Sequence, residues 1–242
     1  MDNSPYILEE TEDFAVVFKP PKMHCAPLKQ KENRAESASA LFDWYASRSS
    51  AFCEMMHRLD FETHGLVLFA KNKKSFEYFK NLQERGEFVK EYSAICANPV
   101  SSELADGFPS PPVISNYTPS TEKPLIINSY FRPYGQGRKL VRPVTEIRKN
   151  YEIAKDNGGF YRTEITSING NNFTARIKRG FRHQIRCHLC WIGFPILNDP
   201  LYSRLQSDGE FLALRAHALF FTDPSNGSKR EYHIDALEKT PF

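Results

Sequence analysis

The sequence predicts an α+β fold built on a mixed, largely antiparallel sheet with flanking helices. Strand-like runs of alternating or continuous apolar residues recur along most of the chain. Three further segments carry apolar residues at helical spacing, and short turn signals separate neighbouring strands in the last third. Strands with only occasional helices between them favour an α+β fold over a repeated β-α-β fold.

The first part of the chain contains three predicted strands and two predicted helices. The strands span 14–19, 65–70 and 88–97, and the helices span 36–48 and 74–85. Pro20 ends the first strand, because proline cannot continue the hydrogen-bonding ladder. The second strand is a continuous apolar run, which indicates burial on both faces. In the second helix Phe76, Phe79 and Leu82 share one side, and Gly86 can end the helix.

The rest of the chain begins with a segment of different character. Residues 98–128 contain six prolines and little periodicity, so we expect an exposed loop or insertion there. After it, the sequence predicts one helix over 182–191, ending at Gly193, and a turn at Asn169-Gly170. The predicted strands of this part lie near 151–154, 160–168, 172–177, 216–221 and 231–235.

Composition is that of a single globular domain spanning 1–242. Hydrophobic residues make up 40% and charged residues 25%, and no apolar run of about 18 residues predicts a membrane span. The acidic N-terminus lacks the apolar core of a signal peptide, and five scattered cysteines indicate reduced thiols, so we expect a cytoplasmic protein. Its net charge of +3 is compatible with a polyanion partner. A monomer is expected.

Three stretches carry side chains that could do chemistry. His57-Arg58-Leu59-Asp60 directly precedes a buried strand, which places Asp60 on a loop at a sheet edge. Lys90 and Tyr92 are two apart in a predicted strand and therefore point to the same face. The third stretch runs from Arg179 to Leu189. Taken singly, each residue has a structural explanation, as a loop cap, a strand aromatic or a surface ion pair.

Together, the stretches resemble the RluA-type RNA pseudouridine synthases. HRLDFETHGLVLFAKN is similar to that family's HRLD, two variable residues, TSG and an apolar strand ending in AK. KEYSA resembles its K-x-Y-x-A segment, and RHQIRCHLCWIGFPILNDPLYS resembles HQIR-x-H followed by G-x-P-I-x-G-D-P-x-Y. VVFKPPKMHCAP and LALRAHALFFTDP resemble its V-x-K-P opening and its L-x-L-H-A-x-x-L-x-F-x-x-P close. The matches follow the family order over almost the whole chain.

The resemblance implies the family's catalytic fold, with a central RNA-binding cleft across the sheet. It implies that Asp60 is the catalytic aspartate, Tyr92 the active-site tyrosine and Arg186 its basic partner. A nearby guanidinium favours the charged form of a carboxylate and could orient Asp60 with a two-pronged contact. Isomerisation of uridine requires no cofactor, because the base supplies both the leaving nitrogen and the returning carbon.

The implied partner is RNA, either ribosomal or transfer RNA. The target base must be flipped out of its stack, and the resemblance implies that Arg58 fills the vacated space. A structural salt bridge is the alternative role for Arg58. Segment 130–149 has six basic residues and one acid, which makes it a candidate surface for the RNA backbone or a plain solvated face. The whole set of predicted RNA-contacting residues is His57, Arg58, Thr63, Lys90, Arg138, Lys139, Arg142, Arg182, His183 and Gln184.

The chain departs from the family pattern at several positions. His64 stands where serine is usual, Arg179 and Phe181 replace the usual threonine and arginine on either side of Gly180, and Asn198 replaces a glycine. These changes bear on RNA contact and substrate choice. Only about 13 residues precede the first predicted strand, so the small N-terminal RNA-binding domain common in the family is expected to be absent.

Two other functions are compatible with parts of the sequence. One is an RNA-binding relative without catalysis, although such a protein has no need for Asp60, Tyr92 and Arg186 together. The other is a metal-dependent hydrolase. Its candidate ligands are His57, Asp60, His64, His183, His188 and Asp199, and Cys187-x-x-Cys190 could suggest zinc. A single CxxC without a second pair is a weak zinc signal, and on a helix these cysteines are expected to pack inward.

Overall fold

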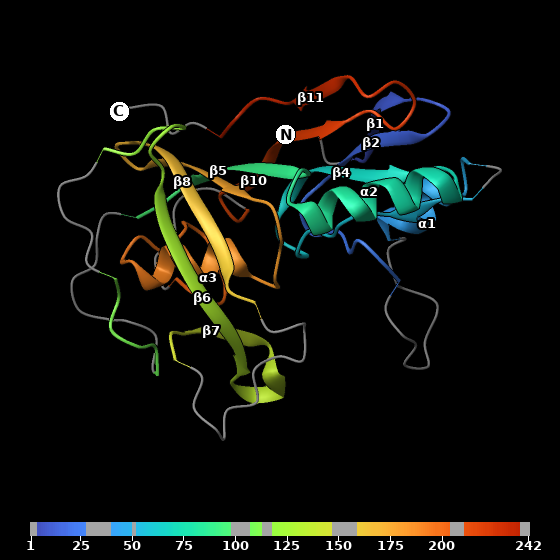
Figure 1. The fold of residues 1–242 in the computed structure, drawn as a ribbon. Coiled ribbons are helices and arrows are strands. Elements are labelled where there is room, and N and C mark those ends of the chain that lie inside the picture. The colour runs from blue at the N-terminus through green and yellow to red at the C-terminus, as the bar shows by residue number, and fades with distance from the viewer. Residues whose placement is uncertain are drawn as a thin grey trace. The chain divides into compact units, whose positions relative to one another are not determined.

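The structure of the chain is a computed structural model, and it describes residues 4–27, 40–49, 52–97, 107–112, 118–146, 159–203 and 211–237. These residues fall into two compact units (Figure 1). Unit 1 comprises 1–90 and 215–235, and unit 2 comprises 91–214 and 236–242. Among the described residues, no helix is long and apolar enough to cross a membrane.

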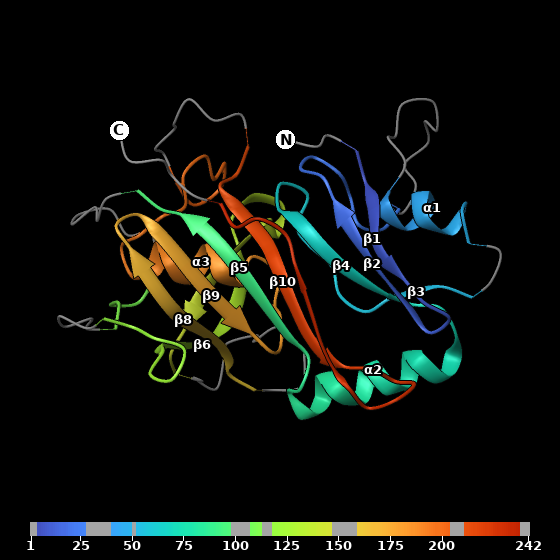
Figure 2. The same ribbon diagram turned by 90° about the horizontal axis from the view of Figure 1, so that it is seen from above.

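Unit 1 contains a sheet with the order β1-β2-β4-β10, in which β3 also pairs with β4 and β11 with β10. The β4–β10 pair is parallel, and the pairs β1–β2, β2–β4, β3–β4 and β10–β11 are antiparallel. Figure 2 shows β1, β2 and β4 side by side, with α1 next to them. The elements are β1 (Tyr6–Glu10), β2 (Phe14–Lys19), α1 (Leu41–Ala46), β3 (Glu54–Met55), β4 (His64–Ala70), α2 (Lys73–Arg85), β10 (Leu214–Thr222) and β11 (Lys229–His233).

The core of unit 1 lies between this sheet and α2. Every residue of β4 is buried, as the continuous apolar run predicted. Phe79 and Leu82 of α2 pack into the same cluster as Phe14 and Leu66. Asn72 begins α2 with a capping box, and Gly86 ends it with a left-handed φ of 70°. The amphipathic spacing that predicted this helix therefore also identified its buried side.

Unit 2 has the strand order β5-β9-β8-β6-β7. The pairs β6–β7, β6–β8 and β8–β9 are all antiparallel. In Figure 1, β6 and β7 form a long hairpin with the short helix η1 at its tip. Helix α3 packs against β7 and β8. The elements are β5 (Val89–Ile95), β6 (Leu125–Tyr134), η1 (Gln136–Arg138), β7 (Leu140–Val144), β8 (Tyr161–Asn169), β9 (Asn172–Ile177) and α3 (Gln184–Trp191).

A buried polar network fixes α3 to the strands of unit 2. His188 Nε2 lies 2.9 Å from Ser129 Oγ on β6, and its Nδ1 lies 2.8 Å from Thr163 Oγ1 on β8. Gln184 Nε2 donates to the same Thr163 oxygen at 3.0 Å, and Gln184 Oε1 accepts the N–H of Phe181 at 2.9 Å. The four side chains on α3 and the strands, those of Ser129, Thr163, Gln184 and His188, are at most 2% exposed, so each polar atom depends on the others.

Three expectations about the elements were wrong. The first strand is β1, not 14–19, because Tyr6–Glu10 is too polar to show a buried pattern and lies half-exposed. Residues 125–128 are not loop but the start of β6; the neighbouring prolines masked their alternation. Helix α3 begins at Gln184 rather than at 182, because His183 adopts a left-handed φ of 57° that no α-helix can include.

The remaining predicted elements agree with the structure where it describes them. The strands at 14–19, 65–70, 88–97, 160–168, 172–177, 216–221 and 231–235 and the helix at 74–85 are confirmed within a few residues. Gly170 supplies the predicted turn with a φ of 56°. The helix over 36–48 is confirmed for Leu41–Ala46. Residues 36–39 and the predicted strand at 151–154 lie outside the described residues.

Prediction on acid stability. Burial lowers the pKa of His188 to about 3. Its unfolded value is near 6.5, so the unfolded state binds more protons below pH 6.5 and stability is lost as pH falls from 6.5 toward 3. His188→Gln removes this titration. We expect a shallower fall in the free energy of unfolding, by roughly 5 kcal/mol at most over that range.

The measurement is urea unfolding between pH 7.5 and pH 4. The exposed His233 gives the matched control, His233→Gln, which should leave the slope unchanged. His57 and His64 are also buried neutral, so an acid slope remains in every variant. Identical slopes for the wild type and His188→Gln would contradict the assignment.

Candidate active site

Asp60 lies on the loop of residues 57–63, between β3 and β4, as predicted. Its side chain is partly exposed, whereas Thr63 is only 2% exposed. The N–H of Thr63 donates to the Asp60 carbonyl at 3.2 Å, which closes a turn just before β4 begins. Asp60 is therefore carried, partly exposed, by a loop with a defined backbone.

A buried lysine is hydrogen-bonded to the backbone of this loop. Lys19, the last residue of β2, is fully buried, and its ammonium donates to three carbonyls: Pro20 at 2.9 Å, Met23 at 2.8 Å and Phe61 at 3.2 Å. Three acceptors match the three donors of an ammonium group. Burial lowers the pKa of Lys19 to about 8, and the negative charge of Asp60 is among the groups that oppose this shift.

Cys25 forms a second tie to the same loop. Its Sγ accepts the N–H of Leu59 at 3.1 Å and donates to the Leu59 carbonyl at 3.3 Å. Burial raises the pKa of the Cys25 thiol, which keeps it protonated and able to donate. We call Lys19 and Cys25 the loop clamp, because their contacts fix the residues immediately before and after Asp60.

The other residues of the HRLD motif alternate between interior and surface. The His57 ring accepts the N–H of Leu68 through Nε2 at 3.2 Å, and burial, followed by the charge of Lys90, lowers its pKa so that it stays neutral. Arg58 is exposed, and Leu59 is 7% exposed. His57 therefore anchors the loop to β4, and Arg58 is available at the surface beside Asp60.

Two departures from the family pattern meet in unit 1. His64 on β4 is the register partner of Arg215 on β10, and Arg215 stands where the family's close has histidine. Burial, then the charges of Arg215 and Lys19, lower the pKa of His64 to about 3. Gly65 follows with a φ of 126°, and a Cβ there would lie 2.2 Å from the Ala216 carbonyl oxygen. The glycine is required because β4 and β10 approach so closely.

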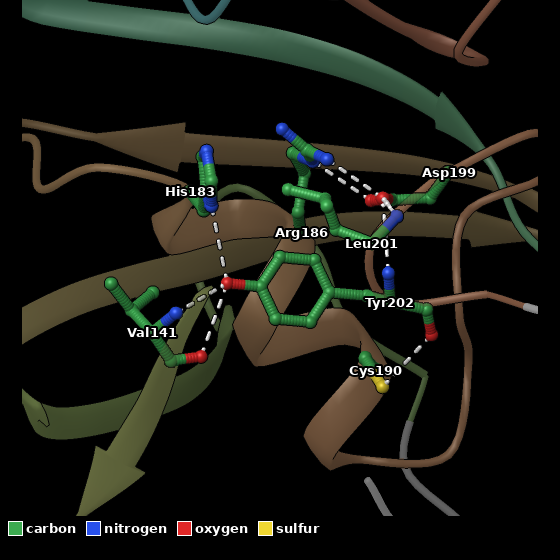
Figure 3. Close-up of polar contacts among 7 residues, drawn as sticks. All are labelled: Val141, His183, Arg186, Cys190, Asp199, Leu201 and Tyr202. Atoms are coloured by element: carbon green, nitrogen blue, oxygen red, sulfur yellow. Dashed lines mark hydrogen bonds and ion pairs between the residues drawn. The ribbon is translucent and has the colours of Figure 1, made fainter. Parts of the chain in front are cut away.

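In unit 2, Arg186 forms a buried two-pronged ion pair (Figure 3). Its Nε and Nη2 donate to the two carboxylate oxygens of Asp199 at 2.8 and 2.7 Å, and both side chains are at most 2% exposed. Asp199 Oδ1 also accepts the N–H groups of Leu201 and Tyr202 at 2.9 and 3.1 Å. The carboxylate therefore joins α3 to the turn that follows it.

Tyr202 extends this network toward the β6–β7 hairpin (Figure 3). Its hydroxyl accepts the N–H of Val141 at 2.8 Å and donates to the Val141 carbonyl at 3.1 Å. His183 Nδ1 lies 3.2 Å from the same hydroxyl, and the Arg186 guanidinium lies 5.5 Å from the Tyr202 ring centre. Arg186 is thus paired with Asp199 and lies over the ring of Tyr202, and both of these residues lie outside the HQIR motif.

The expected two-pronged contact between Arg186 and Asp60 stays a prediction. The fork formed by Nε and Nη2 belongs to Asp199, which is a finding that the motif did not indicate. Arg186 and Asp60 belong to different units. Tyr92 lies on β5, in the predicted strand, and is 6% exposed; Lys90, two residues before it, is also buried.

The predicted RNA-contacting residues differ in their exposure. Arg58, Arg138, Lys139 and Arg182 are exposed, and His57, Arg142 and His183 are partly buried. Arg182 donates through Nη2 to the Arg138 carbonyl at 2.7 Å, which links the start of α3 to the hairpin tip. Thr63, Lys90 and Gln184 are at most 4% exposed, and Lys90 lies over the Phe88 ring at 4.5 Å. These three side chains therefore offer an RNA almost no surface.

Sequence reasoning missed Lys19 and Cys25 as determinants of the Asp60 loop. A lysine within an otherwise apolar, fully buried strand was the available signal for Lys19. For Asp199, the signal was an acid 13 positions after Arg186 in the segment that resembles G-D-P. Both signals mark a buried charge that must find a partner.

The two cysteines of the CxxC pair are buried and hydrogen-bonded to the backbone. Cys187 and Cys190 are buried, as expected, and their thiols donate to different carbonyls, those of Val141 and Tyr202. Among the described residues, no three His, Cys, Asp or Glu side chains gather closely enough to hold a metal ion. The hydrolase hypothesis therefore lacks a ligand set in this part of the chain.

Known proteins resemble this chain in sequence and in fold. Residues 13–191 match the family described as RNA pseudouridylate synthase. The dual-specificity RNA pseudouridine synthase RluA of Haemophilus influenzae is 25% identical over 95% of this chain and 93% of its own length. The ribosomal large subunit pseudouridine synthase D of Buchnera aphidicola is 23% identical over 84% of this chain and 56% of its own length.

A solved structure shares the fold of this chain. The solved structure of human RNA pseudouridylate synthase domain containing 1 superposes with a TM-score of 0.65 at 17% identity, over 96% of this chain and 84% of that one. The expected fold class, mixed α+β with a mostly antiparallel sheet, is thereby confirmed. Because the family match covers most of the chain and includes the Asp60 loop, the β5 strand and α3, the chain belongs to the RNA pseudouridylate synthase family.

Proposed function

We propose that Asp60 is the carboxylate with which this RNA pseudouridine synthase isomerises uridine. One observation carries the assignment: the only acid of the HRLD motif is partly exposed on a loop whose flanking residues are fixed by the buried loop clamp. A catalytic group must be both accessible and positioned, and this carboxylate meets both requirements.

The reaction needs no atoms beyond those of the uridine. The C1′–N1 bond breaks, the released uracil turns over, and a C1′–C5 bond forms. The proton on C5 is then lost, and N1 gains a proton. An ionised Asp60 can assist either by attacking the ribose carbon or by removing a proton that starts an elimination. Both routes require a base that has already left the RNA stack.

Tyr92 and Arg186 are the further residues that we propose act on this uridine. Tyr92 offers a ring for stacking and a hydroxyl that can relay the proton lost from C5. Arg186 offers a guanidinium whose orientation is fixed by Asp199 at 2.7 and 2.8 Å. Such a fixed positive charge can favour the ionised carboxylate without reorganising during the reaction.

The RNA itself is proposed to bind through exposed cations in both units. Arg58 lies two residues from Asp60, where it can fill the space that the flipped nucleotide leaves. The tip of the β6–β7 hairpin carries Arg138 and Lys139, and Arg182 is hydrogen-bonded to it. Neutralising backbone phosphates with such residues makes binding salt-dependent. His57, Arg142 and His183 are proposed to support this surface.

The names of two relatives support a substrate class. One bacterial relative is named as a dual-specificity RNA pseudouridine synthase and the other as a pseudouridine synthase of the large ribosomal subunit. We propose structured ribosomal or transfer RNA as the substrate, and a cytoplasmic monomer that acts without a cofactor. Mapping pseudouridines in cellular RNA with and without the gene tests the substrate.

Prediction on the nucleophile or base. Asp60→Asn keeps the size of the side chain and removes its charge, so we expect release of tritium from C5-labelled uridine in RNA to fall at least about 1,000-fold. RNA affinity should change by less than about threefold, because the substitution removes no cation. Glu54→Gln, an exposed acid on β3, is the matched control. Residual turnover near the wild-type rate would exclude Asp60. No release by the wild type from any RNA would favour the non-catalytic RNA binder.

Prediction on the tyrosine. Tyr92→Phe keeps the ring and removes the hydroxyl, so we expect kcat to fall about 100-fold with little change in KM. Single-turnover rates on saturating RNA measure this directly. If the rate is unaffected, the hydroxyl has no role in proton transfer.

Prediction on pH. Lys19 has a pKa of about 8 and is protonated below it. Above that value its neutral amine has only two N–H donors for three carbonyls, and the positive charge near Asp60 is lost. We therefore expect kcat/KM to fall as pH rises through about 8. The free energy of unfolding should instead increase between pH 8 and 10.5. In that range the lysine is still protonated in the unfolded state but has lost its proton in the folded state.

Lys19→Met should lower kcat/KM and abolish its fall above pH 8, which is the basic limb of the pH profile. Lys90 has a similar pKa, so Lys90→Met is the necessary control. A basic limb that survives in Lys19→Met but disappears in Lys90→Met would assign the titration to Lys90 instead. Circular dichroism of both variants confirms that they remain folded.

A further inference from the structure

The residue directly after the proposed catalytic aspartate carries an exposed aromatic ring. Phe61 is 39% exposed and is one of five large apolar side chains in the described residues with such exposure. Scattered surface apolar residues need no functional explanation. Phe61 differs because it is adjacent in sequence to Asp60 and because a second ring supports it.

The second ring is that of His24. The centres of the two rings are 4.5 Å apart with an interplanar angle of 37°. His24 is partly buried and comes from the segment that follows β2, 37 residues before Phe61. One face of Phe61 is thereby covered by a planar group, and the side chain keeps the exposure needed for a further planar group to stack.

Both rings are carried by a fixed backbone. Lys19 donates to the carbonyl of Met23, the residue before His24, and to the carbonyl of Phe61 itself. Cys25, the residue after His24, is hydrogen-bonded to both backbone groups of Leu59. The first turn of α1 adds two bonds, from the N–H of Leu41 to the His24 carbonyl at 2.9 Å and from the N–H of Phe42 to the Cys25 carbonyl at 3.0 Å. The pair is therefore ordered before any ligand binds, which reduces the entropy lost on binding.

We propose that Phe61, supported by His24, is a stacking platform for an unpaired base adjacent to the target uridine. The inference rests on the proposed function, since it takes Asp60 as the point that the target nucleotide reaches. Neighbouring nucleotides are covalently linked, so a base beside the everted uridine lies within reach of the residue beside Asp60. RNA recognition commonly uses such stacking of unpaired bases on aromatic rings.

The platform also explains where substrate choice is encoded. Phe61 and Glu62 occupy the two variable positions between HRLD and the threonine of the family pattern. A ring at the first of these positions affects which flanking base is preferred, because stacking strength differs among bases. It leaves the chemistry at Asp60 unchanged. Phe61 is therefore a specificity-determining residue and not a catalytic residue.

The test combines a protein change with an RNA change. The probe is a synthetic RNA stem–loop containing a uridine that mapping has identified, made intact or with an abasic nucleotide on either side of that uridine. We expect Phe61→Ala to raise KM for intact RNA about 10-fold, with kcat within about twofold. One of the two abasic RNAs should raise the wild-type KM similarly. Combining this RNA with Phe61→Ala should add little, because both changes remove the same contact.

Two further variants sharpen the result. Phe61→Trp keeps a stacking surface and should retain a KM near that of the wild type. Leu8→Ala is the matched control, because Leu8 lies in the same unit with a nearly identical exposure of 38%. An unchanged KM in Phe61→Ala, or fully additive effects with both abasic RNAs, would overturn the platform.

A binding measurement separates this proposal from the proposed function. 2-Aminopurine placed beside the target uridine should lose fluorescence on binding to the wild-type protein and retain it with Phe61→Ala. Quenching that depends on Phe61 without any tritium release would support the platform and refute isomerisation. Normal tritium release with quenching independent of Phe61 would refute the platform alone.

Discussion

The buried ammonium of Lys19 is the interaction on which the Asp60 loop depends. Removing a charged amine from water costs several kcal/mol, and the cost is offset only when its donors find good acceptors. Here three carbonyls take the three donors, and one of them belongs to the residue after Asp60. Because an ammonium left without an acceptor would be strongly unfavourable, the loop has little freedom to move away. The position of Asp60 is therefore tied to the end of β2.

Unit 2 also contains a buried cation, but its partner is a negative charge instead of a set of carbonyls. Arg186 and Asp199 form an ion pair in the interior, and the carboxylate also accepts two backbone N–H groups. Removing either charge would leave the other buried and unpaired, at a cost of about 3–5 kcal/mol. The neutral network of Ser129, Thr163 and His188 holds the other side of α3. Two polar contacts of different kinds thus set the direction in which α3 presents Arg186.

Much of the fold could be predicted because its signals are local. The continuous run of β4 and the three-residue spacing in α2 predicted their elements within a residue or two. The candidate site was predictable from ordered motifs, and its loop position was confirmed. The wrong predictions have local causes as well. Strand β1 is too polar to reveal a buried face, and prolines obscured the start of β6. The left-handed backbone of His183 makes α3 begin two residues later than predicted.

The sequence by itself determined the family, the motif order, the two-residue spacing of Lys90 and Tyr92 on one strand and the placement of Asp60 before a buried strand. Only the tertiary structure decided which groups hold these residues. Lys19 meets Phe61 across 42 positions, Cys25 meets Leu59 across 34, and Tyr202 meets Val141 across 61. Periodicity reports on neighbours within a turn or a strand, whereas these contacts arise from chain segments that come together only when the core is packed. A polar residue in a segment predicted to be buried is expected to have a hydrogen-bond partner, and the fold decides which partner that is.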